Sequence, residues 1–391
     1  MTTSMSLPGY SAAPSLTFDG FNKYTFTGAD TGSTYKLKYE SNTYDLGTIS
    51  NVYIAHPGTY SVEIKGATNF ALSSNVVGTV ASTKKEYEVE QTLYGTADSD
   101  SPGRGGFGAY MEMNGDGTRM ALGLGMDPTT GQYDGRAKVY HLENGSWTLK
   151  VDIPTPNTSG QRFGDSVCIS EDGTRIAVNH YANTGNGTNA KIYIYDYASG
   201  AWPTTPTKTI NTEDNSGFGD MDMNKAGTVI IAGAGTEGST HKAHIYTRDS
   251  STGNWSTTKS WTGSNEFGSG VAINGAGTRV LIGQRDGGGK VFEANYSSSS
   301  WGNVTEVIST SNSSWPGKIR MDSDGTTCVV IGDAQADAGI YERQSGSSWT
   351  LAHSVLGKGS YYSRGGCAIS YDGTMVLTGY TNSQRDVHMY Q

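Results

Sequence analysis

The chain has 391 residues, a formal net charge of −9, 54 glycines and only 10 prolines. Its length allows two or three domains, and its acidic balance argues against nucleic acid as a partner, because a negative surface repels phosphate. No apolar stretch approaches the ~18 residues of a membrane span, and the first residues lack a signal peptide's basic and apolar regions, so we expect neither membrane insertion nor secretion by that route.

Residues 1–12 are small and polar and predict an extended N-terminal arm. Residues 13–82 then alternate polar and apolar side chains in short runs separated by turn signals, as in Tyr60-Ser-Val62-Glu-Ile64. A period of two predicts half-buried antiparallel strands. A domain of about 70 residues built from such strands is expected to be an immunoglobulin-like β-sandwich.

The remainder, residues 83–391, is built from a repeat. A Gly-Thr pair that closes a short turn recurs about every 50 residues, the size of a four-stranded propeller blade. Each copy has an apolar first strand, a second apolar strand after the turn, a third strand of alternating residues, and a fourth strand near a tryptophan. The glycines of the six turns are Gly117, Gly173, Gly227, Gly277, Gly325 and Gly373. Six copies predict a six-bladed β-propeller.

The composition of each strand predicts its place in a blade. First and second strands are nearly continuous in apolar residues and are expected to be covered on both faces, whereas the alternating third strand is expected to turn one face toward solvent. Glycine follows the opening aromatic residue, as at Gly164, and is expected to make room where the innermost strands converge on the axis. Cys168, Cys328 and Cys367 lie in apolar runs and predict buried free thiols without a disulfide framework.

The two ends of the repeat region predict how the ring closes. The sixth copy stops after a third strand at residues 386–391, and the missing fourth strand is predicted at residues 86–94, before the first copy. A ring closed by three C-terminal strands and one N-terminal strand joins the first and last blades and removes free edges. The predicted fold is therefore all-β, a small immunoglobulin-like sandwich followed by a six-bladed propeller with this 3+1 closure.

The repeat also resembles a known family. Phe163-Gly-Asp-Ser-Val-Cys-Ile-Ser-Glu-Asp-Gly-Thr-Arg175, followed by a Gly-rich loop and Lys191-Ile-Tyr-Ile-Tyr195, resembles the FG-GAP-type repeats of bacterial and viral propellers, over about residues 86–391. The N-terminal region, running into Phe70-Ala-Leu-Ser-Ser-Asn-Val-Val-Gly78, looks like the anchoring modules of marine phage structural proteins. This second resemblance implies a virion protein assembled in the host cytoplasm.

The resemblance raises the question of a metal, because integrin-type relatives bind calcium in an Asp-rich hairpin. Only Asn114-Gly-Asp116 matches that hairpin here. One carboxylate falls short of the roughly six to eight oxygen ligands that calcium takes. We therefore expect no metal and no cofactor.

An enzymatic function requires a cluster of suitable residues. Sialidases, which include six-bladed propellers, hold a carboxylate with arginines and use a tyrosine nucleophile beside an acid. Arg104, Arg162 and Arg364 precede innermost strands and form the one plausible cluster, together with Tyr361 and Tyr362. Three other arginines share the position after Gly-Thr and are assigned to the scaffold: Arg119, Arg175 and Arg279.

Recognition is expected in the long, varied loops between second and third strands, because variable loops on a rigid scaffold commonly carry binding residues. Tyr181 and Asn183 lie in one such loop, and Tyr, Asn, Thr and Gly suit contact with a glycan or a protein. The predicted binding residues are Tyr181, Asn183, Tyr361, Tyr362, Arg104, Arg162 and Arg364.

The leading hypothesis is a non-enzymatic virion structural protein, a tail fibre, capsid fibre or decoration protein. Its arm and sandwich would dock on other virion proteins, and its propeller would project for adhesion. Candidate partners beyond the virion are a cell-surface glycan or protein and further copies of the chain. Two alternatives stay open, a binding propeller of the bacterial cell surface and a sialidase-like glycoside hydrolase.

Overall fold

The structure is a computed structural model of the chain. It describes strands among residues 1–80, and residues 110–390 apart from 126–134, 157–161, 181–189, 213–218, 235–240, 287, 310–316, 332–337, 345, 347, 356–365 and 380–386. The contacts within the chain divide it into two compact units, Met1–Glu90 and Gln91–Gln391. The predicted closing strand, residues 86–94, lies outside the described residues.

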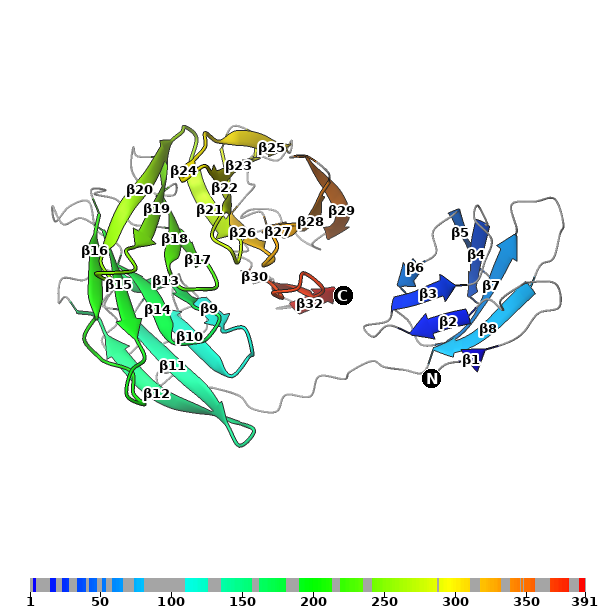
Figure 1. The fold of residues 1–391 in the computed structure, drawn as a ribbon, viewed down its shortest axis with the longest axis horizontal. Helices are drawn as coiled ribbons and strands as arrows, with labels where there is room; N and C mark the ends of the chain where they lie inside the picture. Colours follow the sequence, from blue (N-terminus) through cyan, green and yellow to red (C-terminus); the bar gives the residue numbers. More distant parts are fainter. Residues whose placement is uncertain are drawn as a thin grey trace. The chain divides into compact units, whose positions relative to one another are not determined.

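The described strands of the first unit form two antiparallel four-stranded sheets (Figure 1). The alternating run Tyr60-Ser-Val62-Glu-Ile64 lies within a strand, β7, and β1, inside the predicted arm, pairs with β2. One sheet has the order β1 (Thr3–Ser4), β2 (Ser15–Phe18), β3 (Lys23–Thr27), β6 (Asn51–Tyr53), and the other β5 (Asn42–Gly47), β4 (Thr34–Tyr39), β7 (Gly58–Lys65), β8 (Ser74–Val80).

The described strands of the second unit form successive antiparallel sheets, each made from consecutive strands and numbered here in chain order. The first sheet holds β9 (Tyr110–Met113), β10 (Arg119–Leu124), β11 (Arg136–Glu143) and β12 (Ser146–Pro154). The second sheet holds β13 (Phe163–Ile169), β14 (Arg175–His180), β15 (Lys191–Asp196) and β16 (Lys208–Asn211). The third sheet holds β17 (Asp220–Met223), β18 (Val229–Ala234), β19 (Lys242–Arg248) and β20 (Trp255–Thr262). The fourth sheet holds β21 (Phe267–Ile273), β22 (Arg279–Gln284), β23 (Lys290–Ser297), β24 (Ser300–Trp301) and β25 (Thr305–Ser309). The fifth sheet holds β26 (Lys318–Met321), β27 (Thr327–Ile331), β28 (Ala338–Arg343) and β29 (Trp349–Val355). The sixth sheet holds β30 (Gly366–Ile369), β31 (Val376–Gly379) and β32 (Val387–Tyr390).

The sheets are arranged around a common axis (Figure 1). The first strand of each sheet contacts the first strand of the next, in the series β9, β13, β17, β21, β26 and β30. Because consecutive strands run antiparallel, the connections alternate between two rims. We call the end with the first-to-second turns and the third-to-fourth hairpins the turn rim, and the opposite end the loop rim.

The six predicted turns share one geometry, which confirms the repeat. Their glycines have φ between 63° and 71°, a left-handed conformation that glycine adopts without strain. A polar side chain three residues earlier caps the turn. In the first sheet, Asn114 Oδ1 accepts hydrogen bonds from the backbone N–H groups of Thr118 (3.0 Å) and Arg119 (2.8 Å). These bonds satisfy backbone donors that a tight turn otherwise leaves unpaired.

Neighbouring turns are joined by backbone hydrogen bonds. In each case the second residue of one turn donates its N–H to the carbonyl of the second residue of the next turn. The distances along the series are 2.9, 3.0, 3.1, 2.9 and 2.9 Å. The residues in order are Gly115, Glu171, Lys225, Gly275, Ser323 and Tyr371. Five bonds with one direction thus tie six turns together at the turn rim.

The hydrophobic core lies between successive sheets. Ala121, Val139 and Ile153 of the first sheet pack against Val167 and Tyr195 of the second, and each is at most 4% exposed. β13 is buried at every position and β14 at every position but its first, as predicted. The first strand β9 departs from the prediction, since Met111 and Met113 are 58% and 48% exposed. The third strands differ from the prediction, since the four central residues of β15 are buried too. Neighbouring sheets still cover the third strand, so exposed positions gather on outer strands such as β20.

The glycine after the opening aromatic residue has a different role from the one predicted. Gly164 has φ 94°, and a Cβ there would lie 2.6 Å from the carbonyl oxygen of Arg136 in the preceding sheet. Gly268 approaches the carbonyl of Lys242 in the same way, with φ 93°. These glycines therefore allow one sheet to approach the backbone of its neighbour. Convergence on the axis is not the reason for them.

Candidate functional site

A cluster of polar side chains fills the axis. Its members lie on the first strands of the first, third and fifth sheets, two and four residues before the capping residue of the turn. We call them the axial polar cluster: Tyr110, Glu112, Asp220, Asp222, Lys318 and Arg320. Alternate residues of a strand share one face, so each of these strands presents two polar side chains on the same face.

The alternate sheets carry small residues at the same positions. The second, fourth and sixth sheets have Ser166 and Cys168, Gly270 and Ala272, and Gly366 and Ala368. Six strands that converge on one axis leave little room for side chains. At each of the two repeat positions, three larger side chains alternate with three small ones, so that all six fit around the axis. The layered interiors of barrels are filled in the same way, by side chains from alternate strands.

Arg320 and Asp220 form the central ion pair of the cluster. Arg320 Nη1 and Nη2 donate to the two oxygens of Asp220 at 3.1 and 3.2 Å. Arg320 Nη1 also donates to the carbonyl of Ile319 at 2.7 Å, and Asp220 Oδ2 accepts from the backbone N–H of Val271 at 3.1 Å. The paired bonds of a guanidinium and a carboxylate fix orientation as well as charge. This pair thus connects the third, fourth and fifth sheets.

The other two carboxyl groups also bond to the neighbouring sheet. Asp222 Oδ2 accepts from the backbone N–H of Ile273 at 2.9 Å, and its Oδ1 accepts from Met223 at 2.8 Å. Glu112 accepts from the backbone N–H of Ile169. The first strand of a sheet has a free edge toward the axis, and the carboxyl groups satisfy donors along it. The first sheet is therefore bonded to the second, and the third to the fourth, through carboxyl groups of the cluster.

Burial changes the ionisation of these groups. It raises the pKa of Glu112 well above its usual range, and the negative charge of Asp222 raises it further. Burial also raises the pKa of Asp222 to about 6, against the lowering effect of Arg320. Burial alone would lower the pKa of Arg320, but Asp220 and Asp222 outweigh it and hold that pKa above its usual value. The cluster thus places a permanent cation beside carboxyl groups that hold their protons to higher pH than an ordinary carboxyl group does.

Aromatic rings lie at both ends of the cluster. Lys318 Nζ lies 4.7 Å from the centre of the Tyr110 ring. At the turn rim, Lys225 Nζ lies 4.9 Å from the centre of the Tyr371 ring and 3.0 Å from Glu171 Oε1. Burial raises the pKa of Tyr371, and Glu112 and Asp222 raise it further, which places the Tyr371 hydroxyl in the field of the cluster. Cation–π contacts of this kind stabilise by about 0.5–2 kcal/mol.

A second polar network joins sheets near the turn rim. The scaffold role predicted for three arginines is confirmed, because each donates to the carbonyl of the turn glycine in the next sheet. Arg119 Nη1 donates to Gly173 (2.9 Å), Arg175 Nη1 to Gly227 (2.7 Å) and Arg279 Nη1 to Gly325 (2.7 Å). The repeat position therefore encodes a joint between sheets.

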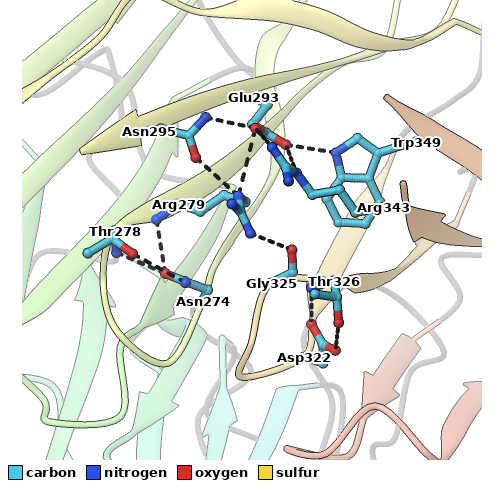
Figure 2. A network of polar contacts seen from close by, with 10 residues as sticks. All are labelled: Asn274, Thr278, Arg279, Glu293, Asn295, Asp322, Gly325, Thr326, Arg343 and Trp349. Atoms are coloured by element: carbon cyan, nitrogen blue, oxygen red, sulfur yellow. Dashed lines mark hydrogen bonds and ion pairs between the residues drawn. The ribbon is translucent and has the colours of Figure 1, made fainter. Parts of the chain in front are cut away.

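The joint between the fourth and fifth sheets centres on Glu293, as Figure 2 shows. Glu293 is 2% exposed and accepts from Arg343 through both oxygens (3.2 Å each), from Trp349 Nε1 (2.8 Å) and from Asn295 Nδ2 (2.7 Å). Arg279 Nε lies 3.7 Å away. Burial would raise the pKa of Glu293, but the hydrogen bonds from Arg343, Asn295 and Trp349 hold it below its usual value.

One residue of the predicted binding set lies within the described residues. Arg162 Nη1 lies 3.7 Å from Asp165 Oδ2 at the loop rim. The other members lie outside the described residues: Tyr181, Asn183, Tyr361, Tyr362, Arg104 and Arg364. Sequence reasoning missed the axial polar cluster. Glu112, Asp222 and Arg320 do occupy one repeat position, but the residue type at that position differs from copy to copy.

The structure assigns the calcium-like hairpin a role in the turn. Asp116 Oδ1 accepts from the backbone N–H of Thr118 at 2.9 Å and from its hydroxyl at 2.5 Å, while Asn114 caps the same turn. Among the described residues, no three His, Cys, Asp or Glu side chains are placed to hold a metal ion. In the same part of the chain, no helix is long and apolar enough to cross a membrane.

Comparison with known proteins identifies the architecture. No protein family model matches the sequence, and no curated protein matches it. The chain is similar to the structure of a putative 6-phosphogluconolactonase from Bacteroides fragilis, at 11% identity and a TM-score of 0.51, over 92% of this chain and 90% of that one. It is also similar to the β-propeller domain of Cps50 (Swd1) from Myceliophteria thermophila, at 11% identity and a TM-score of 0.50, over 74% and 83%. The repeated sheets therefore form a β-propeller, and at this identity the likeness concerns the fold alone.

Proposed function

We propose that the chain is a non-enzymatic structural protein of a virus particle, whose first unit docks on the particle and whose propeller presents its loop rim. The observation that supports a scaffold best is the use of the axial polar groups. Asp220, Asp222 and Arg320 bond to one another and to the edges of neighbouring strands, which stabilises the ring. The virion assignment rests on the sequence resemblance to phage anchoring modules.

The proposed propeller has six blades of FG-GAP type and a 3+1 closure. Six repeats correspond to the six described sheets of Gln91–Gln391, and the sixth has three described strands, β30 to β32. Residues 86–94 supply its fourth strand in this proposal. Deletion of residues 86–94 is expected to unfold the whole second unit, because a ring with an open edge loses its last joint. Cooperative unfolding unchanged by the deletion would contradict the closure.

The location on a particle has a direct test. Mass spectrometry of purified virions from the host should detect the chain among the structural proteins, incorporated through its first unit. A variant that lacks residues 1–82 should fold as a propeller but be missing from particles. Recovery of the full chain in the bacterial envelope and not in particles would favour the first alternative, a binding propeller of the bacterial cell surface.

The loop rim is the proposed adhesive surface. Its candidate ligand is a cell-surface glycan or protein, bound by the predicted residues Tyr181, Asn183, Tyr361, Tyr362, Arg104, Arg162 and Arg364. Binding of the full chain to host cells or to a glycan array should fall at least tenfold for Tyr181→Ala. The matched control is Tyr296→Ala, since Tyr296 is 43% exposed on a hairpin of the turn rim. Equal losses for the two variants would argue against the loop rim.

One observation favours the second alternative, a glycoside hydrolase. Such enzymes need a carboxylic acid that keeps its proton near neutral pH, and Glu112 and Asp222 have raised pKa values. Turnover of a glycan panel, abolished by Glu112→Gln and by Tyr361→Phe, would establish this activity. Absence of turnover by a folded chain that still binds cells would leave the structural role.

A further inference from the structure

The axial polar cluster concentrates charge from alternate sheets in one small volume. Glu112 comes from β9, Asp220 and Asp222 from β17, and Arg320 from β26. With every group ionised, the three negative charges of Glu112, Asp220 and Asp222 would exceed the two positive charges of Arg320 and Lys318 by one. Asp220 and Asp222 are 2% and 7% exposed, and like charges repel strongly in a poorly solvated site. The excess negative charge would fall between β9 and β17.

Given the groups around Glu112 and Asp222, a bound proton is the simplest compensation for the excess negative charge of the cluster. The neighbours of Glu112 are the backbone N–H of Ile169, the ion pair of Asp220 and Arg320, and Asp222. Asp222 faces the backbone N–H groups of Ile273 and Met223. The remaining titratable groups that sense the cluster are Cys168, Cys367 and Tyr371, with Lys318 beside Cys367.

The neighbouring thiols and hydroxyl do not supply charge near neutral pH. Burial raises the pKa of Cys168 well above its usual value, that of Cys367 to about 11, and that of Tyr371 as well. Arg320 is committed to Asp220 through two hydrogen bonds. Glu112 and Asp222 are therefore the members of the cluster that can change charge in the physiological range.

We infer that the axial polar cluster is a proton-operated clamp, in which proton uptake by Glu112 and Asp222 tightens the propeller across its axis and proton release loosens it. The clamp goes beyond the proposed virion role and does not depend on it. With the protons bound, β9 and β17 approach without repulsion, and the pair of Asp220 and Arg320 is electrically balanced. With the protons released, the same two strands carry opposing negative charge at the centre of the ring.

The clamp predicts an unusual direction of pH dependence. The folded pKa of Asp222, about 6, exceeds its ordinary value of 3.8. The folded chain thus holds a proton that the unfolded chain releases between about pH 4 and pH 6, so stability falls as pH rises through that window. A difference of about two pKa values corresponds to roughly a hundredfold in the unfolding equilibrium constant. Glu112, whose pKa is also raised by burial, adds to the effect in the same direction.

Titration of the folded wild-type protein is the first test. Carbon-13 NMR of the side-chain carboxyls should give a midpoint near pH 6 for Asp222 and a midpoint for Glu112 well above the ordinary ~4.3 of a glutamate. The carboxyl resonance of Glu112 should be missing from the spectrum of Glu112→Gln, and that of Asp222 from the spectrum of Asp222→Asn, which confirms the two assignments. Midpoints below about pH 4.5 for both groups would overturn the proposal, whether or not the variants fold.

Stability measurements are the second test. The wild-type melting temperature should fall from pH 5 to pH 8, and Asp222→Asn with Glu112→Gln should remove that fall. The control is Asp152→Asn, because Asp152 is a carboxylate of β12, about one-third exposed, that is paired with Arg136 at 2.8 Å. It should keep the wild-type pH profile. A double variant that folds and retains the full wild-type dependence would refute the clamp.

Discussion

Replacement of Glu293 by glutamine tests the reasoning about joints between sheets. The change keeps the size of the side chain and removes its charge. Every neighbour of Glu293 in Figure 2 is a hydrogen-bond donor: Arg343, Trp349, Asn295 and Arg279. A glutamine presents one oxygen and one NH2 group, so the NH2 group must face donors. At least two of these donors then lose their acceptor.

The structure sets the size of the expected effect. A buried donor without an acceptor costs about 1–3 kcal/mol, and breaking a buried ion pair costs about 3–5 kcal/mol. We therefore expect Glu293→Gln to lower the free energy of unfolding by about 4 kcal/mol. Glu306→Gln is the matched control, because Glu306 pairs with Lys290 at 2.6 Å while both side chains are about one-third exposed. An exposed pair contributes at most about 1 kcal/mol.

Urea unfolding followed by tryptophan fluorescence measures both variants. Since the pKa of Glu293 is lowered in the folded protein, its contribution is present above the ordinary ~4.3 of a glutamate and is lost as pH falls through the lower folded value. The wild type and Glu293→Gln should therefore approach equal stability in strong acid. Losses for Glu293→Gln that match Glu306→Gln at pH 7 would refute the argument.

Two further predictions concern backbone approach and thiol burial. Gly164→Ala should cost about 3 kcal/mol or more in thermal unfolding, because its Cβ would meet the carbonyl of Arg136 and its φ is positive. Gly145→Ala, with φ 77° and open space around its Cβ, should cost only about 1 kcal/mol; equal costs would contradict the close approach. Cys168 and Cys328 are fully buried, and burial raises their pKa values, so thiol titration at pH 7.5 should modify them only after denaturation. Rapid modification of both in the native protein would contradict this burial.

Local signals in the sequence predicted much of the fold. The Gly-Thr pairs marked turns whose glycines do adopt positive φ, and the tryptophans marked fourth strands such as β20 and β29, which begin at Trp255 and Trp349. These features succeed because a turn depends on a few consecutive residues. The exposure of third strands was predicted wrongly, since it depends on how far neighbouring sheets extend. Alternation of residue types within β15 cannot report that distance.

The candidate site was beyond the reach of local signals. Asp220 and Arg320 are 100 residues apart and belong to sheets that are not neighbours in the chain. Only the ring geometry brings them together. Comparison of repeat positions was sufficient to identify the arginines that donate to the next turn, because three of the six copies have arginine at the position of Arg175. The axial positions carry different residues in each copy, so that comparison did not single them out.

The hydrogen bonds between turns have a consequence for sequence variation at the turn rim. They use only main-chain atoms, so they can form with different side chains at the second turn position. Glycine, glutamate, lysine, serine and tyrosine all occupy the second turn position in this one chain. Substitutions of the side chains at this position can therefore change the charge and shape of the mouth of the axis without removing a main-chain bond, although they alter side-chain contacts such as that of Lys225 with Glu171. In a propeller built this way, the side chains at one end can vary while the main-chain framework stays the same.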